Sequence, residues 1–420
     1  MHFKDFFKKL KMKKIQLLPV LFIISTINLY PQLSSHEFGG YVSDMPYIMY
    51  QSYGDSNDVY QQNILHNRLK YKWYANDKFT FNIEMRNQFL WGDNVNNNYN
   101  PKGFETENYF LPLSFYGHTS GNSLFYSVID RANITYTKGD FETVAGRQRI
   151  NWGQTFAFNP NDIFNSYNFF DFDYPEKPGA DAIKLQYYTG YTSSLQLAAK
   201  IDSGNNVTAA AMYKFNKWKY DVQLMSGFFS YDSYSLAFDA NYIPYYKPQN
   251  HQDIFFGTGW SGDFFGLSFR GELSYFQPAK NFLDTSGVFL SSFAFDYTFT
   301  NEMYISAEFL YQQNDSLALS DFASFYTNTR NAKTLSDFKY NLVAQMSYPL
   351  TPILNFTFAG MYFWQDDFKG IYVFPSIALS TSDNTEFAVM YQFFSYKDKL
   401  LTYDKWLNTQ IGFLRFKWSF

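Results

Sequence analysis

Residues Phe79–Leu90 read FTFNIEMRNQFL, and their side chains alternate in character along the stretch. The odd-numbered residues are apolar except for Asn87, whereas the even-numbered residues up to Gln88 are polar or charged. Successive side chains of a β-strand point to opposite faces, while a helical face repeats every 3.6 residues. The stretch therefore predicts a strand with one apolar face and one polar face.

The same alternation recurs beyond residue 36 in segments of roughly ten residues, the length that a tilted membrane strand needs. In a soluble sandwich the apolar faces would line a core, but here they are too numerous and too aromatic, with Tyr and Trp near the strand ends. A lipid-facing band with aromatic belts accounts for them better. The segments are Ala182–Tyr188, Leu195–Ile201, Val207–Phe215, Tyr220–Phe228, Leu267–Tyr275, Phe293–Phe299, Tyr340–Tyr348, Leu354–Met361 and Phe387–Phe393.

Composition supports a membrane barrel. The 420-residue chain is 22% aromatic and only 17% charged, yet its mean hydropathy is −0.34. A helical membrane protein would be far more hydrophobic on average, and a soluble domain rarely carries so much Tyr and Phe. A barrel that alternates apolar and polar residues fits both numbers. The absence of cysteine excludes a disulfide framework and lipoprotein acylation.

Short and long connections alternate between the predicted strands, as periplasmic turns and outer loops do in outer-membrane barrels. We therefore predict an all-β, antiparallel, up-and-down transmembrane barrel of about 18 strands, with 16 as the alternative. This count assigns Tyr234–Ala240 to an outer loop. The predicted short turns include 75–78, 138–140, 189–192, 215–217, 261–263, 298–302, 348–352 and 380–384, and the long loops 49–63, 92–121, 151–179, 229–251, 277–286, 314–335 and 396–406.

Residues 1–36 have the character of a secretory signal peptide. A lysine-rich segment precedes the apolar run Ile15–Thr26, which is too short to span a bilayer as a helix. We place the cleavage region between residues 26 and 36, and leave open whether translation starts at Met1 or Met12. The barrel domain is then 37–420, and export places it in the outer membrane of a Gram-negative cell.

The chain ends in GFLRFKWSF, in which aromatic and apolar residues occupy alternate positions up to Phe420. This ending resembles the terminal signal by which the insertion machinery recognises bacterial outer-membrane barrels. The expected partners are this machinery, through Phe420, together with outer-membrane lipid, lipopolysaccharide and small solutes. Residues 1–36 hold six lysines and one aspartate, so the remainder has 28 basic and 37 acidic residues, a net charge of −9 that argues against nucleic acid as a partner.

From residue 37 onward the chain resembles porin-like outer-membrane barrels of the Bacteroidetes type. The stretches that carry the resemblance are GRQRINWG at Gly146–Gly153 and GTGWSGDFFGLSFRGELSYF at Gly257–Phe276. The chain is also similar, more distantly, to alginate-export-type barrels. The resemblance implies a transport role in the outer membrane and identifies no substrate.

Charged residues of the strands are expected to point into the barrel, because Arg or Lys facing lipid at the bilayer midplane costs about 2–4 kcal/mol. Strand parity then places roughly fifteen basic and about six acidic residues inside. The basic set is Arg68, Lys70, Lys72, Arg86, Arg131, Arg147, Arg149, Lys184, Lys200, Lys214, Lys219, Arg270, Lys339, Arg415 and Lys417, and the acidic set is Glu84, Asp221, Glu272, Asp296, Glu308 and Glu386.

This excess of positive charge predicts a pore that prefers anionic or polar solutes. The alternative is that the charges pair across neighbouring strands, as Glu84 with Arg86 and Arg270 with Glu272 would do. Parity also leaves Asp130 pointing outward, unless a β-bulge or a position near the rim resolves the conflict. The residues expected to line the pore and its narrow part are Arg68, Arg86, Arg131, Arg147, Arg149, Arg270 and Glu272.

The loop 151–179 is the predicted constriction. Asn159-Pro160 interrupts its strand trend, and its many aromatic rings need a dry environment. Either the loop packs inside the barrel mouth or it stacks against sugar rings of a substrate. Trp152 is expected to mark the point where the preceding strand leaves the membrane. The predicted constriction residues are Trp152, Phe156, Phe158, Pro160, Asp162 and Phe164.

No metal, cofactor or catalytic site is predicted. Asp171, Asp173 and Glu176 offer oxygen ligands for calcium, but their spacing matches no twelve-residue calcium loop, so we favour a solvated acidic segment. The few histidines beyond residue 36 lack metal-pair spacing, and no nucleophile motif is present. The expected function is a non-enzymatic channel for small polar or anionic solutes. The alternatives are an export channel for an anionic polysaccharide and a plugged barrel that acts as a scaffold or surface-binding protein.

Overall fold

The computed structural model describes residues 35–53, 56–93, 95, 109–120, 122–165, 176–238, 244–282, 287–313, 331–366, 368–397 and 406–420. Within these ranges no helix is long and apolar enough to cross a membrane. A short 3₁₀ segment, η2 (Ala279–Asn281), follows β12. The strands are β1 (His36–Tyr53), β2 (Ser56–Tyr74), β3 (Phe79–Gly92), β4 (Ser114–Ser120), β5 (Ser123–Lys138), β6 (Phe141–Gln148), β7 (Ala180–Gly190), β8 (Ser193–Ile201), β9 (Val207–Lys217), β10 (Tyr220–Phe238), β11 (Pro244–Phe264), β12 (Leu267–Pro278), β13 (Val288–Thr298), β14 (Tyr304–Gln312), β15 (Tyr340–Thr351), β16 (Leu354–Gln365), β17 (Phe368–Ser382), β18 (Thr385–Lys397) and β19 (Trp406–Ser419).

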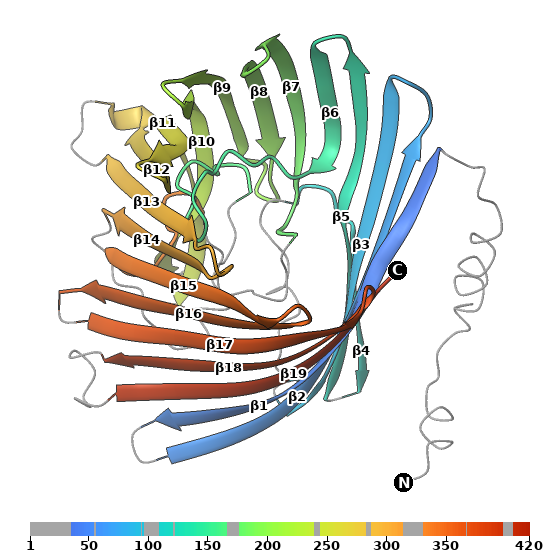
Figure 1. The fold of residues 1–420 in the computed structure, drawn as a ribbon. Helices are drawn as coiled ribbons and strands as arrows, with labels where there is room; N and C mark the ends of the chain where they lie inside the picture. Colours follow the sequence, from blue (N-terminus) through green and yellow to red (C-terminus); the bar gives the residue numbers. More distant parts are fainter. Residues whose placement is uncertain are drawn as a thin grey trace.

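The strands form one closed antiparallel barrel (Figure 1). The first strand closes it, because β1 pairs with β2 on one side and with the last strand, β19, on the other. Tyr41, for example, lies opposite Arg68 of β2 and Ser419 of β19. Closure gives both the first and the last strand a neighbour on each side, as a sheet that spans a bilayer requires.

The barrel has eighteen strand positions, although nineteen strands are present. The long-loop half of β5 pairs with β4, and its other half pairs with β6, while β3 pairs along the full opposite edge. β4 and β6 therefore share one position beside β5. The prediction of 18 strands is confirmed, and the alternative of 16 is wrong.

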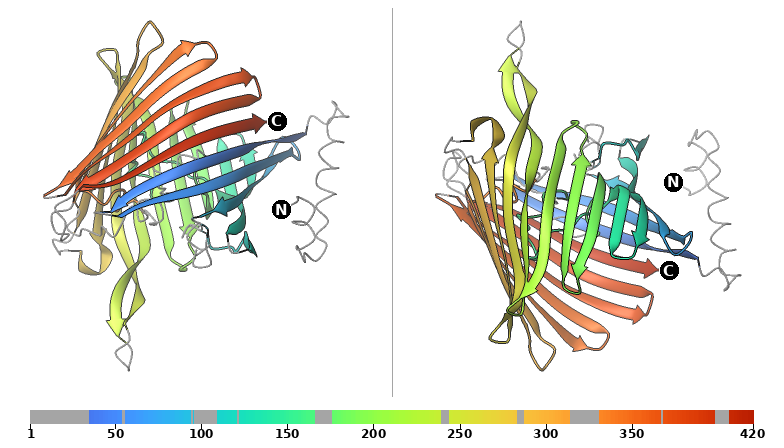
Figure 2. Two further views of the ribbon diagram at one scale, coloured as in Figure 1. Left: turned by 90° about the horizontal axis from the view of Figure 1, so that it is seen from below. Right: turned by 90° about the horizontal axis from the view of Figure 1, so that it is seen from above.

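The connections at one end of the barrel are all short, whereas those at the other end range from two residues, as between β1 and β2, to long loops. Figure 2 shows both ends. Two predicted turns are displaced along the chain. The β11–β12 turn lies at Phe265-Gly266 instead of 261–263, because Phe264 pairs with Leu267. The β9–β10 turn lies at Trp218-Lys219 instead of 215–217, because Lys217 still pairs with Tyr220. Lys219 is consequently a turn residue with φ +66°, and the prediction that it points inward from a strand is wrong.

Two predicted outer loops are largely strand. Tyr53 pairs with Ser56, so β1 and β2 together cover most of 49–63. β10 and β11 remain paired to Phe238 and Pro244, so most of the segment assigned to an outer loop, Tyr234–Ala240, continues a strand. β9 and β12 stop earlier, and the hairpin therefore extends beyond the barrel as a two-stranded arm (Figure 2). It adds no strand to the barrel wall, so the predicted number of spanning strands is unchanged.

Asp130 occupies a β-bulge. Arg131 lies opposite Glu84 and Ile129 lies opposite Met85, which leaves Asp130 as the extra residue on β5. A bulge allows two consecutive side chains to point to the same face. Asp130 and Arg131 are both buried in the interior, so the bulge, and not a rim position, resolves the parity conflict.

The inner face of the wall is apolar over a wide sector as well as charged. Buried Met, Phe, Tyr and Ile side chains of β14–β19 and β1 form one cluster, which includes Met390 and Phe413. A second cluster joins β8–β13 and contains Phe255 and Phe276. The charged sector lies on β2–β7, so the interior has one basic wall and one apolar wall.

Candidate functional site

The segment after β6 turns into the barrel and crosses its interior (Figure 1). Trp152 is 1% exposed, and its indole Nε1 donates a hydrogen bond to Gln196 Oε1 of β8 at 2.9 Å. Its ring packs edge-on against Phe164, at a centroid distance of 4.9 Å. The prediction that Trp152 marks the exit of a strand from the membrane is therefore wrong, because this residue lies inside the barrel.

Two wall carboxylates hold the middle of this loop through its backbone N–H groups. Glu272 of β12 accepts hydrogen bonds from the backbone N–H groups of Gln154, Thr155 and Asn161, at 2.5–2.9 Å, and from the Thr155 hydroxyl at 2.9 Å. Glu272 is fully buried. Four donors of the loop converge on this one side chain, so Glu272 fixes the loop to β12.

Glu308 of β14 provides the second anchor. It accepts hydrogen bonds from the backbone N–H groups of three successive residues, Phe156, Ala157 and Phe158, at 2.7–2.8 Å, and from the hydroxyl of Ser292 at 3.0 Å. The consecutive donors form a concave nest around the carboxylate. The loop is thus fixed to the wall opposite the strand from which it starts.

Apolar side chains of the loop reinforce the two anchors. Phe158 packs into the cluster of β14–β19, whereas Ile163 and Phe164 pack into the cluster of β8–β13. Pro160 and Asp162 are buried in the same stretch. Phe156 is half-buried beneath the Arg270 guanidinium, which lies 4.5 Å above its ring. Every residue predicted for the constriction therefore lies inside the barrel, in contact with the wall or the rest of the loop.

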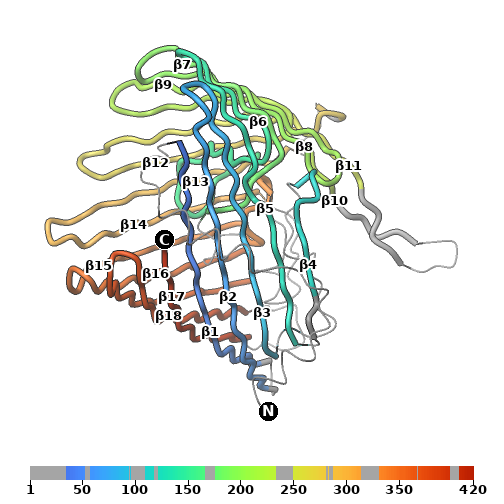
Figure 3. Tube along the Cα trace, turned by 90° about the vertical axis from the view of Figure 1, so that its right-hand side faces the viewer, coloured from blue at the N-terminus to red at the C-terminus, as the bar shows by residue number. Residues whose placement is uncertain are grey.

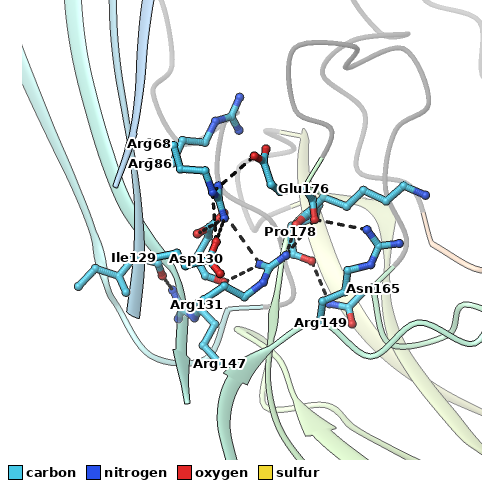
Figure 4. Close-up of polar contacts among 12 residues, drawn as sticks. Arg68, Arg86, Ile129, Asp130, Arg131, Arg147, Arg149, Asn165, Glu176 and Pro178 are labelled. Atoms are coloured by element: carbon cyan, nitrogen blue, oxygen red, sulfur yellow. Dashed lines mark hydrogen bonds and ion pairs between the residues drawn. The ribbon is translucent and has the colours of Figure 1, made fainter. Parts of the chain in front are cut away.

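Arg68 is the centre of an ionic cluster on the opposite wall (Figure 4). Its guanidinium is fully buried and contacts Asp130 at 2.8 Å, Glu84 at 2.6 Å and Glu176 at 3.7 Å. Arg86, directly across from it on β3, donates through Nε to His66. Two arginines can occupy adjacent positions here because the acids lie around Arg68.

Arg131 and Arg149 fix the return of the chain to β7. Arg131 Nη2 donates to the carbonyl oxygens of Glu176 and Lys177, at 2.9 and 2.7 Å. Arg149 lies one residue beyond the end of β6 and donates to the Glu176 carbonyl and to Asn151 Oδ1, both at 3.3 Å. Its Nε has no hydrogen-bond acceptor within the described ranges.

The guanidinium of Arg147 makes all its contacts with other groups of the protein. Its guanidinium pairs with Asp181 in bidentate geometry, at 2.8 and 2.9 Å, and donates to the carbonyl oxygens of Ile129 and Leu111. It also lies 3.9 Å from the centre of the Tyr109 ring. The side chain is 0% exposed, so it positions the segment around Leu111 and offers no charge to a solute.

Lys177 adds a cation whose pKa is lowered. It follows Glu176 in the loop before β7 and has a positive φ of 57°. Burial first, and then the nearby Arg149 guanidinium, lower the pKa of Lys177 to about 8. The cluster has seven cations against five carboxylates, an excess of two positive charges. Its members are Arg68, Lys70, Arg86, Arg131, Arg147, Arg149 and Lys177, with Glu84, Asp130, Asp162, Glu176 and Asp181.

The individual ion pairs differ from those expected between i and i+2. Glu84 pairs with Arg68 instead of Arg86, and Arg270 pairs with Asp296 at 3.3 Å, which leaves Glu272 for the loop. Pairing across neighbouring strands is nevertheless common, and the predicted inward cations Lys184, Lys214 and Arg415 all have acidic partners. The predicted excess of about nine positive charges was too large, because inward parity alone did not include the acids of bulges and loops.

Sequence reasoning missed three acids of this cluster. Asp130 was placed on the outer face, and Glu176 and Asp181 were read as part of a solvated acidic segment. The sequence did contain a signal for them, because the strands that carry the arginines are followed by a loop whose end is acidic. Of the possible calcium ligands, Asp171 and Asp173 lie outside the described residues, and Glu176 is engaged by Arg68 and Tyr41. The described part of the chain contains no group of three metal-ligating side chains.

Solved structures share this architecture. OccAB2 of Acinetobacter baumannii superposes with a TM-score of 0.52, at 9% identity, over 91% of this chain and 98% of that chain. OccK9 (OpdG) of Pseudomonas aeruginosa gives a TM-score of 0.52, at 10% identity, over 92% of this chain and 98% of that chain. The chain has the fold of porin-like outer-membrane barrels of Gram-negative bacteria. No protein-family profile matches the sequence, and no curated protein sequence matches it.

Proposed function

We propose that this protein is a non-enzymatic outer-membrane channel for small polar solutes, with a preference for anions. The observation that carries the proposal is the loop fixed across the interior of an 18-strand barrel by Glu272 and Glu308. A barrel of this size encloses an aqueous space unless it is filled. A loop held at its middle narrows that space to a path between itself and the basic wall.

The charge of that path supports an anion preference. Arg68 and Arg147 are neutralised by buried carboxylates, but the cluster keeps two more cations than acids. Arg149 and Lys177 are close enough to act on each other electrostatically, and they share the one carboxylate of Asp162 as a neighbour. Rings of basic residues in a pore favour anions over cations. These two side chains, rather than the whole row of arginines, are the proposed selectivity residues.

We also propose a Bacteroidetes-type origin, on the resemblance of Gly146–Gly153 and Gly257–Phe276 to such barrels. Export through a signal peptide in residues 1–36 and residence in the outer membrane belong to the same proposal. Phe420 is the proposed contact for the insertion machinery, and lipid and lipopolysaccharide are the proposed surroundings. In the folded barrel Phe420 exchanges two backbone hydrogen bonds with Gly40, at 2.9 and 3.0 Å.

Planar-bilayer recording of the purified protein tests the channel. We expect discrete conductance steps and a reversal potential, in a salt gradient, that reports anions as the more permeant ions. The matched variant Arg149→Gln/Lys177→Gln should keep the conductance steps and lose most of the selectivity. Cation selectivity in the natural protein would refute the anion preference. The absence of any conductance would refute the channel and favour the plugged scaffold.

An export channel for an anionic polysaccharide is the second candidate, because aromatic rings and cations lie together inside the barrel, as in the pair of Phe156 with Arg270. Liposome swelling separates the two functions. A small-solute channel admits short neutral and anionic sugars at rates that fall with size. An exporter should instead transmit anionic oligosaccharides much faster than neutral ones of the same length.

A further inference from the structure

The outer wall of the barrel carries a row of polar side chains where lipid is expected. Asn67 of β2, Asn87 of β3 and Ser127 of β5 lie directly opposite one another in register. We call these three residues the amide row. They share the outward parity of Leu65 and Ile83, which are 37% and 49% exposed. The amide row therefore belongs to the face that meets the bilayer, and Figure 3 follows β2, β3 and β5 side by side.

The amide row lies between the aromatic ends of these strands, within the apolar band. Toward the tight turns, Trp73 stacks on Phe81, with ring centroids 5.0 Å apart. Toward the long loops, Phe89 packs against Trp91 at 5.2 Å. Aromatic girdles mark the two interfaces of a membrane barrel. Polar groups between them face hydrocarbon, which offers no hydrogen-bond partner.

Hydrogen bonds within the amide row satisfy it only in part. Asn67 Nδ2 donates to the Tyr41 carbonyl at 3.1 Å, Asn87 Nδ2 donates to Asn67 Oδ1 at 3.1 Å, and the Ser127 hydroxyl donates to Asn87 Oδ1 at 2.7 Å. Each amide thus uses one of its two N–H donors in contacts with described residues. The second N–H of each remains for a partner from outside the barrel.

Acceptors without a partner lie beside these donors. Asp44 of β1 is on the same face, opposite Leu65 and the 38%-exposed Phe416, and none of the ion pairs among described residues involves it. Asn63 Oδ1 is buried and has no hydrogen-bond partner within the described ranges. We call Asp44, Asn63 and the amide row together the seam patch, because they adjoin the closure of β1 on β19.

A hollow of about 510 Å³ lies beside the seam patch and is lined by Pro46, Ile48, Asn63, Trp91, Gly412 and Leu414. Two features account for it, a gap in strand pairing and a missing side chain. Met45 and Pro46 are left out of the β1–β19 ladder, and proline has no N–H to contribute to it. At Gly412 an added Cβ would meet nothing within 4 Å. The outer wall is therefore concave as well as polar at this place.

We propose that the seam patch is where a second copy of this chain packs in the membrane. Another embedded protein can supply hydrogen-bond partners at this depth, whereas acyl chains cannot. The patch presents amide donors on β2 and β3 and the Asp44 carboxylate on β1, so it is complementary to itself. An axis parallel to the barrel wall brings the donors of one copy to the acceptors of the other.

Single-cysteine cross-linking tests this contact, since the natural chain has no cysteine. Ser127→Cys and Asn87→Cys place a thiol in the seam patch. Ser226→Cys is the matched control, because Ser226 is exposed on the outer face of β10 between Leu224 and Phe228. We expect a short bifunctional maleimide, applied to intact outer membranes, to give a species of twice the mass with the patch variants and not with Ser226→Cys.

A second variant separates the contact from folding and transport. Asn67→Leu/Asn87→Leu should shift the natural oligomer to monomers by native mass measurement in mild detergent. Heat-modifiable gel migration and the conductance per barrel should stay unchanged, so failure here is distinct from failure of the channel proposal. Patch thiols that react with a monofunctional maleimide but never cross-link, or that cross-link only to a different protein, would overturn the inference. A natural protein that is monomeric in the membrane would overturn it too.

Discussion

Arg147 points into the barrel, yet its role is to stabilise the fold. All three nitrogens of its guanidinium donate hydrogen bonds, and its partner Asp181 is only 6% exposed. Removal of Arg147 would leave that carboxylate buried without its cation. Breaking a buried pair in this way costs about 3–5 kcal/mol.

We therefore expect Arg147→Ala to lower the free energy of unfolding by about 3–5 kcal/mol, measured by denaturant unfolding in lipid vesicles. Arg147→Lys should not restore it, because a single ammonium cannot reproduce the bidentate pair and the two carbonyl contacts. Lys214→Ala is the control. Its pair with Asp221 is 36% and 40% exposed and is worth about 0–1 kcal/mol. Equal losses from Arg147→Ala and Lys214→Ala would contradict this account.

Lys177 gives a prediction on pH. Because its pKa is lowered to about 8, the ammonium is charged at pH 6.5 and largely neutral at pH 9.5. The positive charge of the path falls as the pH rises through this range, so we expect the anion-to-cation permeability ratio to fall with it. Reversal potentials across this range measure the effect. Lys177→Met should show a lower ratio at pH 6.5 and little further change; the same fall in the variant would exclude Lys177 as the titrating group.

At the scale of elements, the inward loop is held by acceptors on the wall and donors on its own backbone. Almost any sequence has backbone N–H groups, so the loop itself carries no strong signature of this contact. The signature lies in Glu272 and Glu308, two buried carboxylates on strands far from the basic wall. Their role is to hold the loop in place, which differs from the ion pair with Arg270 that the sequence suggested for Glu272.

Removal of both anchors should release the loop. We expect Glu272→Ala/Glu308→Ala to raise the single-channel conductance about two-fold and to increase current noise, because the loop no longer keeps one position in the bore. Limited proteolysis of the folded barrel should then cut within 150–165. Glu386→Ala provides the comparison, since this wall carboxylate pairs with Arg415 and does not touch the loop. Unchanged conductance in the double variant would mean that the loop does not limit the flow.

At the scale of the whole molecule, the seam between β1 and β19 decides whether the sheet becomes a barrel. Gly40 lies at this seam, where its backbone exchanges hydrogen bonds with Phe420. A Cβ at Gly40 would approach the Arg68 carbonyl oxygen to 2.1 Å, a contact that strand pairing cannot accommodate. The close approach of the backbone explains why glycine occupies this position.

We expect Gly40→Val to reduce the yield of closed barrel sharply, seen as loss of the heat-modifiable band after refolding into detergent. Gly412→Ala should fold normally, because a Cβ at this other seam glycine meets nothing within 4 Å. If both variants assemble equally well, the tight approach at Gly40 is not required for closure.

The sequence by itself determined the barrel. Alternation in stretches such as Phe79–Leu90 is a local property with a period of two, and it fixes strand, inward face and outward face without knowledge of any neighbour. The aromatic belts, the alternation of connection lengths and the count of 18 follow from the same reading. The sequence also identified Asn87 as the polar residue on an apolar face, but it did not indicate a role for it.

Only the tertiary structure decided which charges meet. Ion pairing depends on strand register, on a one-residue bulge at Asp130 and on the path of loops that return acids such as Glu176 and Asp181 to the wall. A shift of one residue reverses which face a side chain occupies, and no local pattern records such a shift. For this reason the sequence left open whether the arginines were free or paired, whereas the folded chain neutralises Arg68 and Arg147 and uses Glu272 and Glu308 to hold a loop.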